Sequence, residues 1–211
     1  MSTAETSVPT PVPTPVPTRA RLVGAAGELF RRQGYAATGI KAVLESAHAP
    51  YGSLYHFFPG GKAELGVAVI DDGARTFEEL VRTHFAPPDD VVTLVRSFFD
   101  GAALVVEGSD SADACPVATF AGEVAAADEG MRAAAAAAFR SWIDALTERL
   151  VADGLDTTTA RELATNGFCL LEGAFLLARV TRDAEPVRAA GRAMAMLTEE
   201  ALAARSPVGS F

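Results

Sequence analysis

The sequence is poor in the side chains that build disulfide scaffolds, metal centres and catalytic sites. Its 211 residues include two Cys and three His, and Cys115 and Cys169 are too few to staple a secreted domain. The pair Glu45-x-x-His48 has metal-ligand spacing, but a di-metal helical bundle needs two such pairs and further carboxylates. We therefore expect a cytoplasmic protein without catalytic residues, metal or cofactor. Stoichiometric metal or cofactor in the purified protein would point instead to an enzyme.

Long apolar runs and β-branched runs are also missing. No uninterrupted apolar run reaches the roughly 18 residues that a membrane span needs, and the best candidate, residues 167–178, carries Glu172. The first residues lack the basic and apolar segments of a secretory signal, so we expect no membrane partner. Alanine is abundant instead, as in residues 133–138, and alanine favours helix over strand. The predicted fold class is all-α.

Basic residues are outnumbered, and they are unevenly distributed. The chain has 18 Lys or Arg against 27 Asp or Glu, a formal net charge of −9. Residues 1–62 hold six Lys or Arg against three acids, which gives +3. Residues 63–211 hold twelve Arg against 24 acids, which gives −12. A mildly basic head on an acidic body predicts that an anionic partner binds at the head.

The chain divides into four predicted segments. In residues 1–17 every second position of VPTPVPTPVP is Pro, which predicts a disordered or semi-stiff tail; a Pro-rich ligand for a partner domain is the alternative. Residues 18–64 form a unit of short helices and residues 65–205 a larger helical domain, followed by a second tail at residues 206–211.

Three short helices are predicted in residues 18–64. Thr18 has the character of an N-cap for a helix over residues 19–33, which Gly34 ends. Thr38 is expected to cap a short second helix. A third helix over residues 51–57 follows a tight spacer, which is the arrangement of a helix-turn-helix unit.

The third helix is too short to be stable alone. Leu54 and Phe58 are expected to anchor it to the first two helices, and Lys62 adds a positive charge at the start of the next helix. Phenolic hydroxyl and imidazole groups can bond to phosphate oxygens, and small residues allow close approach to a groove. The side predicted to face solvent consists of Tyr51, Gly52, Ser53, Tyr55 and His56.

These residues resemble the DNA-binding domain of the TetR family of bacterial repressors. The similarity runs from residue 19 to residue 65 and rests on AAGELFRRQGYAATGIKAVLESA followed by GSLYHFFPGGKAEL. The form GSLYHFFPGGK resembles the multidrug-regulator branch with LmrA-like proteins, and CPVATFAGEVA, from residue 115, resembles the ligand domain of that branch. The resemblance implies double-stranded operator DNA as a partner.

The resemblance also assigns DNA contacts: Thr38, Lys41, Tyr51, Gly52, Ser53, Tyr55, His56 and Lys62. The first two match phosphate-contacting positions of the second helix, and the last three match positions that clamp the backbone. Tyr51 and Gly52 match positions that reach base edges. The related branch often has Lys where this chain has Tyr51, and Tyr cannot make a bidentate guanine contact, so the operator sequence is open.

The larger domain is predicted to bind a ligand. After a helix from about residue 62 to residue 84, its helices are expected at residues 91–106, 116–127, 130–152, 158–180 and 186–204. Its aromatic and sulfur side chains can line a cavity for a hydrophobic inducer or simply form the core. They are Phe98, Phe99, Cys115, Phe120, Trp142, Phe168 and Phe175. Glu172 either faces solvent or is a buried carboxylate for a cationic ligand.

The helix over residues 158–180 is apolar around much of its circumference, which predicts burial on more than one side. One face is rich in small residues and is the predicted homodimer interface: Leu163, Gly167, Leu170, Ala174 and Ala178. The resemblance implies the same arrangement, in which the last two helices of each subunit form an intersubunit four-helix bundle.

The sequence therefore predicts a homodimeric transcriptional repressor that a small molecule releases from its operator. The alternative is a ligand-binding helical dimer that acts through a protein partner without binding DNA. A gel shift against DNA upstream of the coding region distinguishes the two.

Overall fold

The computed structural model describes residues 16–108, 122–124 and 128–205, and the regular elements in these ranges are helices joined by turns, with no strand among them. The predicted all-α fold class is confirmed. Most of both predicted tails, together with Cys115 and Phe120, lies outside the described residues. The helices are α1 Thr18–Gln33, α2 Ile40–Ser46, α3 Ser53–Phe57, α4 Gly61–His84, α5 Val91–Gly108, α7 Glu129–Ala152, α8 Thr157–Thr181 and α9 Glu185–Ala204.

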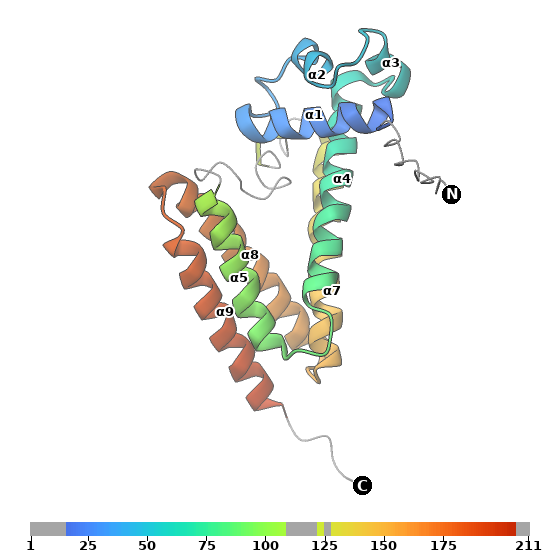
Figure 1. The fold of residues 1–211 in the computed structure, drawn as a ribbon. Coiled ribbons are helices and arrows are strands. Elements are labelled where there is room, and N and C mark those ends of the chain that lie inside the picture. The colour runs from blue at the N-terminus through green and yellow to red at the C-terminus, as the bar shows by residue number, and fades with distance from the viewer. Residues whose placement is uncertain (1–15, 109–121, 125–127, 206–211) are drawn as a thin grey trace, which may run out of the picture.

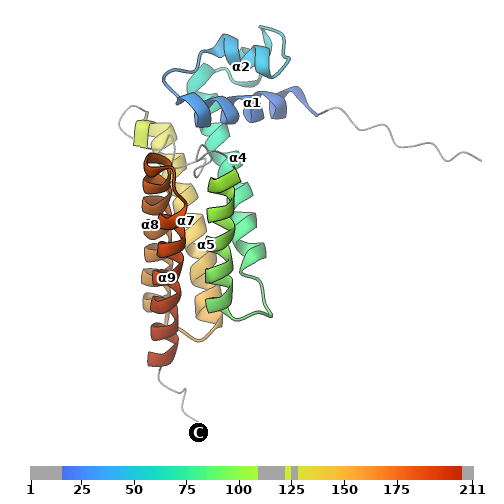
Figure 2. The same ribbon diagram turned by 60° about the vertical axis from the view of Figure 1, so that its left-hand side comes forward.

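The helices form a small head and a longer body (Figure 1). Helices α1 to α3 make the head, and α4 descends from it alongside α7. Helices α5, α7, α8 and α9 run roughly along one direction and, with α4, make up the body (Figure 2). The predicted boundary between residues 64 and 65 falls inside α4, so one continuous helix joins head and body.

Local sequence signals account for several helix ends. Asp156 caps α8 because its side chain accepts from the backbone N–H of Thr158 and Thr159 at 3.0 and 3.1 Å. Gly34 ends α1 with a φ of 86°, a left-handed conformation that favours glycine. The predicted cap by Thr18 is wrong, because Thr18 is already helical and Pro17 precedes it without a side-chain bond.

The body core is aromatic and closely packed. Trp142 is fully buried, and its indole N–H donates to the carbonyl of Ala74 in α4 at 2.9 Å. Its ring lies 4.5 Å from that of Phe77 and 6.1 Å from that of Phe168, centroid to centroid. Within the described ranges, α8 is the one helix long and apolar enough to cross a membrane by length and composition, and it packs here against α7 and α9.

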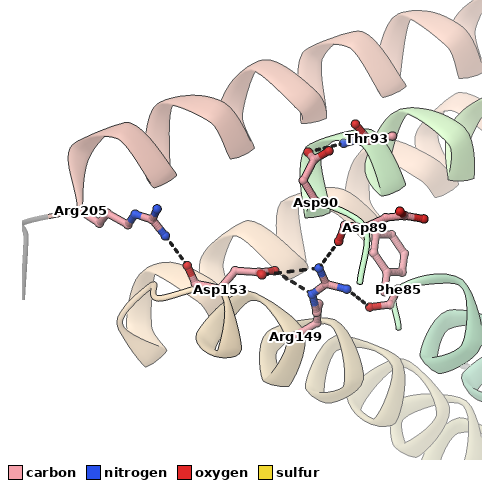
Figure 3. Close-up of polar contacts among 7 residues, drawn as sticks. All are labelled: Phe85, Asp89, Asp90, Thr93, Arg149, Asp153 and Arg205. Carbon is pink, nitrogen blue, oxygen red and sulfur yellow. Dashed lines mark hydrogen bonds and ion pairs between the residues drawn. The ribbon is translucent and has the colours of Figure 1, made fainter. Parts of the chain in front are cut away.

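Arg149 of α7 fixes the end of α4 that lies far from the head (Figure 3). Its guanidinium group donates to the backbone carbonyls of Phe85 and Asp89, in the connection between α4 and α5. It also pairs with Asp153 at 2.7 Å, and the backbone carbonyl of Asp153 accepts from Arg205 beyond the end of α9. Because the Arg149 side chain is only 11% exposed, water competes little for these bonds.

Replacing Arg149 with Met should destabilise the protein by about 2–3 kcal/mol, because two carbonyls and a carboxylate lose their shared donor. Urea unfolding at a fixed protein concentration measures this change. Arg132→Met is the matched control, because among the described residues the Arg132 side chain pairs with Glu129 on the same exposed helix turn. Equal unfolding midpoints for the two variants would contradict the anchoring role of Arg149.

Candidate nucleic-acid interface

Helix α3 is held in place by two buried side chains. Leu54 and Phe58 are both fully buried, which confirms them as the anchors of this short helix. The helix begins at Ser53 and not at the predicted residue 51. The reason is a turn in which the backbone N–H of Ser53 donates to the carbonyl of Pro50 at 2.9 Å. Tyr51 lies in that turn, immediately before the helix.

The outer side of this segment presents an aromatic and polar surface. Tyr51 is 73% exposed and Tyr55 is 52% exposed, and His56 is exposed as well. Open space surrounds Gly52, where an added Cβ would meet no atom within 4 Å. Ser53 is half-buried at the start of the helix. These groups therefore form one surface that can approach a groove closely, with hydroxyl and imidazole groups available for phosphate oxygens.

The glycine pair after α3 has a structural role. Gly61 has a φ of 69°, and a Cβ there would lie 3.6 Å from a ring carbon of Tyr55. The backbone N–H of Gly60 donates to the carboxylate of Glu64 at 2.7 Å, which ties the turn to the first residues of α4. Gly61 thus lets the chain reverse tightly beneath Tyr55.

Lys41 lies on the exposed side of α2. Its side chain is 85% exposed, and its ammonium group is 3.8 Å from the carboxylate of Glu45. A surface pair of this kind is weak and easily exchanged. Lys41 is therefore free to neutralise a phosphate.

Thr38 is placed differently from the prediction. Its side chain is 1% exposed, and its hydroxyl donates to the carbonyl of Gly34 at 2.7 Å and accepts from Gln33 at 3.1 Å. The N-cap of α2 is Gly39, which makes no side-chain bond. Thr38 thus closes the end of α1, and both its predicted capping role and its predicted phosphate contact are corrected.

Lys62 is also turned away from the predicted partner. Its ammonium group donates to the carbonyl of Tyr35 at 2.7 Å and lies 4.3 Å from the centre of the Tyr35 ring. Burial lowers the pKa of this ammonium group, and the nearby Glu123 partly opposes that shift. Lys62 was expected to contact the DNA backbone. Its contacts with Tyr35 indicate instead a role within the protein.

Arg19 is a basic residue beside α3 that was not among the predicted DNA contacts. It is exposed in the first turn of α1, and its guanidinium carbon lies 5.2 Å from the centre of the Phe58 ring, at the end of α3. Arg19 lies near α3 because α1 packs against α3. The spacing of apolar residues along the sequence does not reveal this contact between helices. The available signal was only a basic residue at the start of a predicted helix.

The part of the predicted ligand pocket that the described residues form is nearly filled. A cavity of about 20 Å³, enough for one water molecule, lies between α4, α5, α7, α8 and α9. Of the predicted lining residues, Phe98, Phe99 and Phe168 border it, whereas Trp142 belongs to the surrounding core. Glu172 and Phe175 are half-buried elsewhere on α8. The described cavity is therefore much smaller than the roughly 300–1,000 Å³ of a typical ligand site.

The predicted dimer face points into its own subunit, which is a correction. Gly167 faces Met194 of α9, and a Cβ there would lie 3.4 Å from the Met194 sulfur. Leu163, Ala174 and Ala178 are also buried within the subunit, and Leu170 is half-buried. Small residues let α8 approach α9 closely, so they mark an intrasubunit contact.

Other large apolar side chains of these two helices are exposed. We call them the α8–α9 strip, and they are Leu176, Leu177, Val180, Met196 and Leu197. Val180 is 74% exposed and Met196 is 66% exposed, and exposed apolar side chains in such number are typical of an interaction surface.

Comparison with known proteins adds the family. Residues 22–69 match "Bacterial regulatory proteins, tetR family", and residues 91–193 match the C-terminal domain of LmrA/YxaF-like transcriptional regulators. YxaF of Bacillus subtilis, an uncharacterized HTH-type transcriptional regulator, is 30% identical over 169 residues, which cover 80% of this chain and 88% of YxaF. An uncharacterized HTH-type regulator of Mycobacterium tuberculosis is 36% identical over 176 residues, with the same two coverages.

The fold has solved counterparts. A TetR transcriptional regulator from Legionella pneumophila superposes with a TM-score of 0.76 at 23% identity, covering 86% of this chain and 97% of the other. This likeness supports the fold, and the sequence relatives carry the assignment. The chain belongs to the TetR family of bacterial transcriptional regulators, in the branch with an LmrA/YxaF-like C-terminal domain.

Proposed function

We propose that this regulator is a repressor that binds operator DNA as a homodimer and is released by a small apolar molecule. The observation that supports the DNA-binding part is the exposed surface around α3. Tyr55 and His56 lie on this helix, Tyr51 lies in the turn before it, and Leu54 anchors the helix from its buried side. The charge distribution also supports DNA binding through the head, because the basic head attracts phosphate while the acidic body repels it.

The α8–α9 strip is the proposed dimer interface. A two-fold axis through this strip would bring two pairs of helices together and bury its apolar side chains. The symmetry would also present two copies of α3 on one side of the dimer. To read consecutive major grooves, these copies must lie roughly 34–36 Å apart, one turn of B-DNA.

The small cavity suggests how a ligand acts. The described residues that line it include no charged side chain, so a neutral, hydrophobic molecule fits their chemistry better than a cationic one. A ligand larger than water must push its walls apart. Two of those wall residues, Val81 and Phe85, come from the end of α4 and the residue after it, so expansion would displace the helix that carries the head.

The release mechanism makes a direct prediction. A neutral aromatic compound that raises the melting temperature of the protein, found by thermal-shift screening, should weaken operator affinity at saturating concentration by at least about tenfold. Fluorescence anisotropy with labelled operator measures the change. Equal operator affinities with and without every stabilising compound would contradict ligand-released repression.

The two tyrosines should affect DNA binding in different ways. Tyr55→Phe removes a hydroxyl without changing the ring, so affinity should fall about fivefold for every sequence tested. Tyr51→Ala should instead change which bases are preferred, because it removes a proposed base contact. Binding to a randomised duplex pool, followed by sequencing, compares the preferences. An unchanged preference for Tyr51→Ala would reject the base contact.

A charge in the α8–α9 strip should break the dimer. Val180→Glu places two carboxylates near the two-fold axis in an apolar interface, and the dimer dissociation constant should rise at least about 100-fold. Analytical ultracentrifugation measures the mass over a range of concentrations. Leu80→Glu is the matched control, because Leu80 is 51% exposed on α4 and does not belong to the α8–α9 strip. A dimer equally stable in both variants would place the interface elsewhere.

A further inference from the structure

The turn between α1 and α2 is held from two sides by oppositely charged residues. On one side, the carboxylate of Glu123 accepts from the backbone N–H of Tyr35 at 3.0 Å and from that of Ala36 at 2.7 Å. On the other side, the ammonium group of Lys62 donates to the carbonyls of the same two residues, at 2.7 Å and 3.5 Å. The peptide groups of the turn therefore lie between an anion at their N–H ends and a cation at their carbonyl ends.

Glu123 reaches the head from another part of the chain. It belongs to the short described segment 122–124, some 87 positions beyond the turn, and its neighbour Val124 is buried. The carboxylate also approaches Gly34, where an added Cβ would lie 3.1 Å from one of its oxygens. A side chain at Gly34 would crowd this approach, so the glycine that ends α1 also makes room for Glu123.

The body packs closely against the same turn. A Cβ added at Gly66 of α4 would lie 3.2 Å from the ring of Tyr35 and 2.5 Å from the sulfur of Met131 in α7. The Tyr35 ring thus lies where the head meets both α4 and α7. The hydrogen bonds of Glu123 and Lys62 orient the backbone at this junction, and the ring packs into it.

We propose that Lys62 and Glu123 are positioning residues, which together clamp the α1–α2 turn and set the orientation of the head on the body, and that Lys62 does not neutralise a DNA phosphate. We call this arrangement the turn clamp. Its effect on operator affinity rests on the DNA binding proposed above. The clamp itself does not, because its bonds lie within one subunit.

Salt dependence distinguishes a positioning lysine from a phosphate-binding lysine. Each neutralised phosphate contributes about 0.9 to the slope of log affinity against log salt concentration, so losing one contact per head lowers the slope of a dimer by about 1.8. Lys62→Met should weaken operator binding with no change of slope. Lys41→Met, the matched control on the exposed side of α2, should lower the slope by about 1.8. A loss of that size for Lys62→Met would overturn the proposal.

Hydrogen exchange tests the clamp without DNA. The amides of Tyr35 and Ala36 should exchange at least about tenfold faster in Glu123→Ala than in the wild type, because both lose a charged acceptor. Glu123→Gln keeps one acceptor oxygen, so its effect should lie between the two. Glu79→Gln removes the same charge from an exposed position on α4, so it should leave the exchange rates of both amides unchanged. Unchanged protection in Glu123→Ala would show that no clamp exists, whatever the protein does with DNA.

The third measurement joins the clamp to DNA binding. Releasing the turn lets each head sample orientations that the duplex must then restrict, so Glu123→Ala should bind operator at least about fivefold more weakly than Glu79→Gln. Faster amide exchange with operator affinity equal to or tighter than that of the control would overturn the positioning role. Absence of DNA binding in the wild type would reject the proposed function and, with it, the role of the clamp in operator binding, while the exchange result would still stand.

Discussion

The close approach of α4 and α7 is the contact on which the placement of the head depends. Gly66 permits this approach, since an added Cβ would lie 2.5 Å from the sulfur of Met131 and would force that side chain or the helix to shift. With the helices in contact along their length, α4 leaves the body in a defined direction and carries the head with it (Figures 1 and 2). Leu54 and Phe58 then fasten the five-residue α3 to the other head helices.

Signals that act over a few residues made much of this architecture predictable. Apolar spacing of three and four residues placed the long helices, and the anchors of α3 followed from the same pattern. Gly34 marked the end of α1 because left-handed turns have strong residue preferences. The exposure of Tyr51, Tyr55 and His56 agreed with the predicted surface for the same local reason.

The errors concern contacts between distant parts of the chain. Thr38 has a residue type suited to an N-cap, but the hydroxyl finds a nearer partner in the carbonyl of Gly34. Small residues such as Gly167 indicate close helix packing, yet they do not reveal whether the neighbour is α9 of the same subunit or another chain. Lys62 finds its carbonyl partners 27 positions earlier, where no periodicity could place them. The sequence likewise shows that the body is rich in aromatic side chains, but it does not show how large a cavity they leave between the helices.

Arg149 gives α4 the mechanical properties of a lever. The guanidinium group of this α7 residue binds the segment between α4 and α5. That end of α4 is therefore fixed to α7, while the other end carries the head. Twenty-four residues span about 36 Å, and a tilt of about 5° about the pinned end displaces the far end by roughly 3 Å. A tilt of that size would move the head by a step comparable to the spacing of adjacent base pairs.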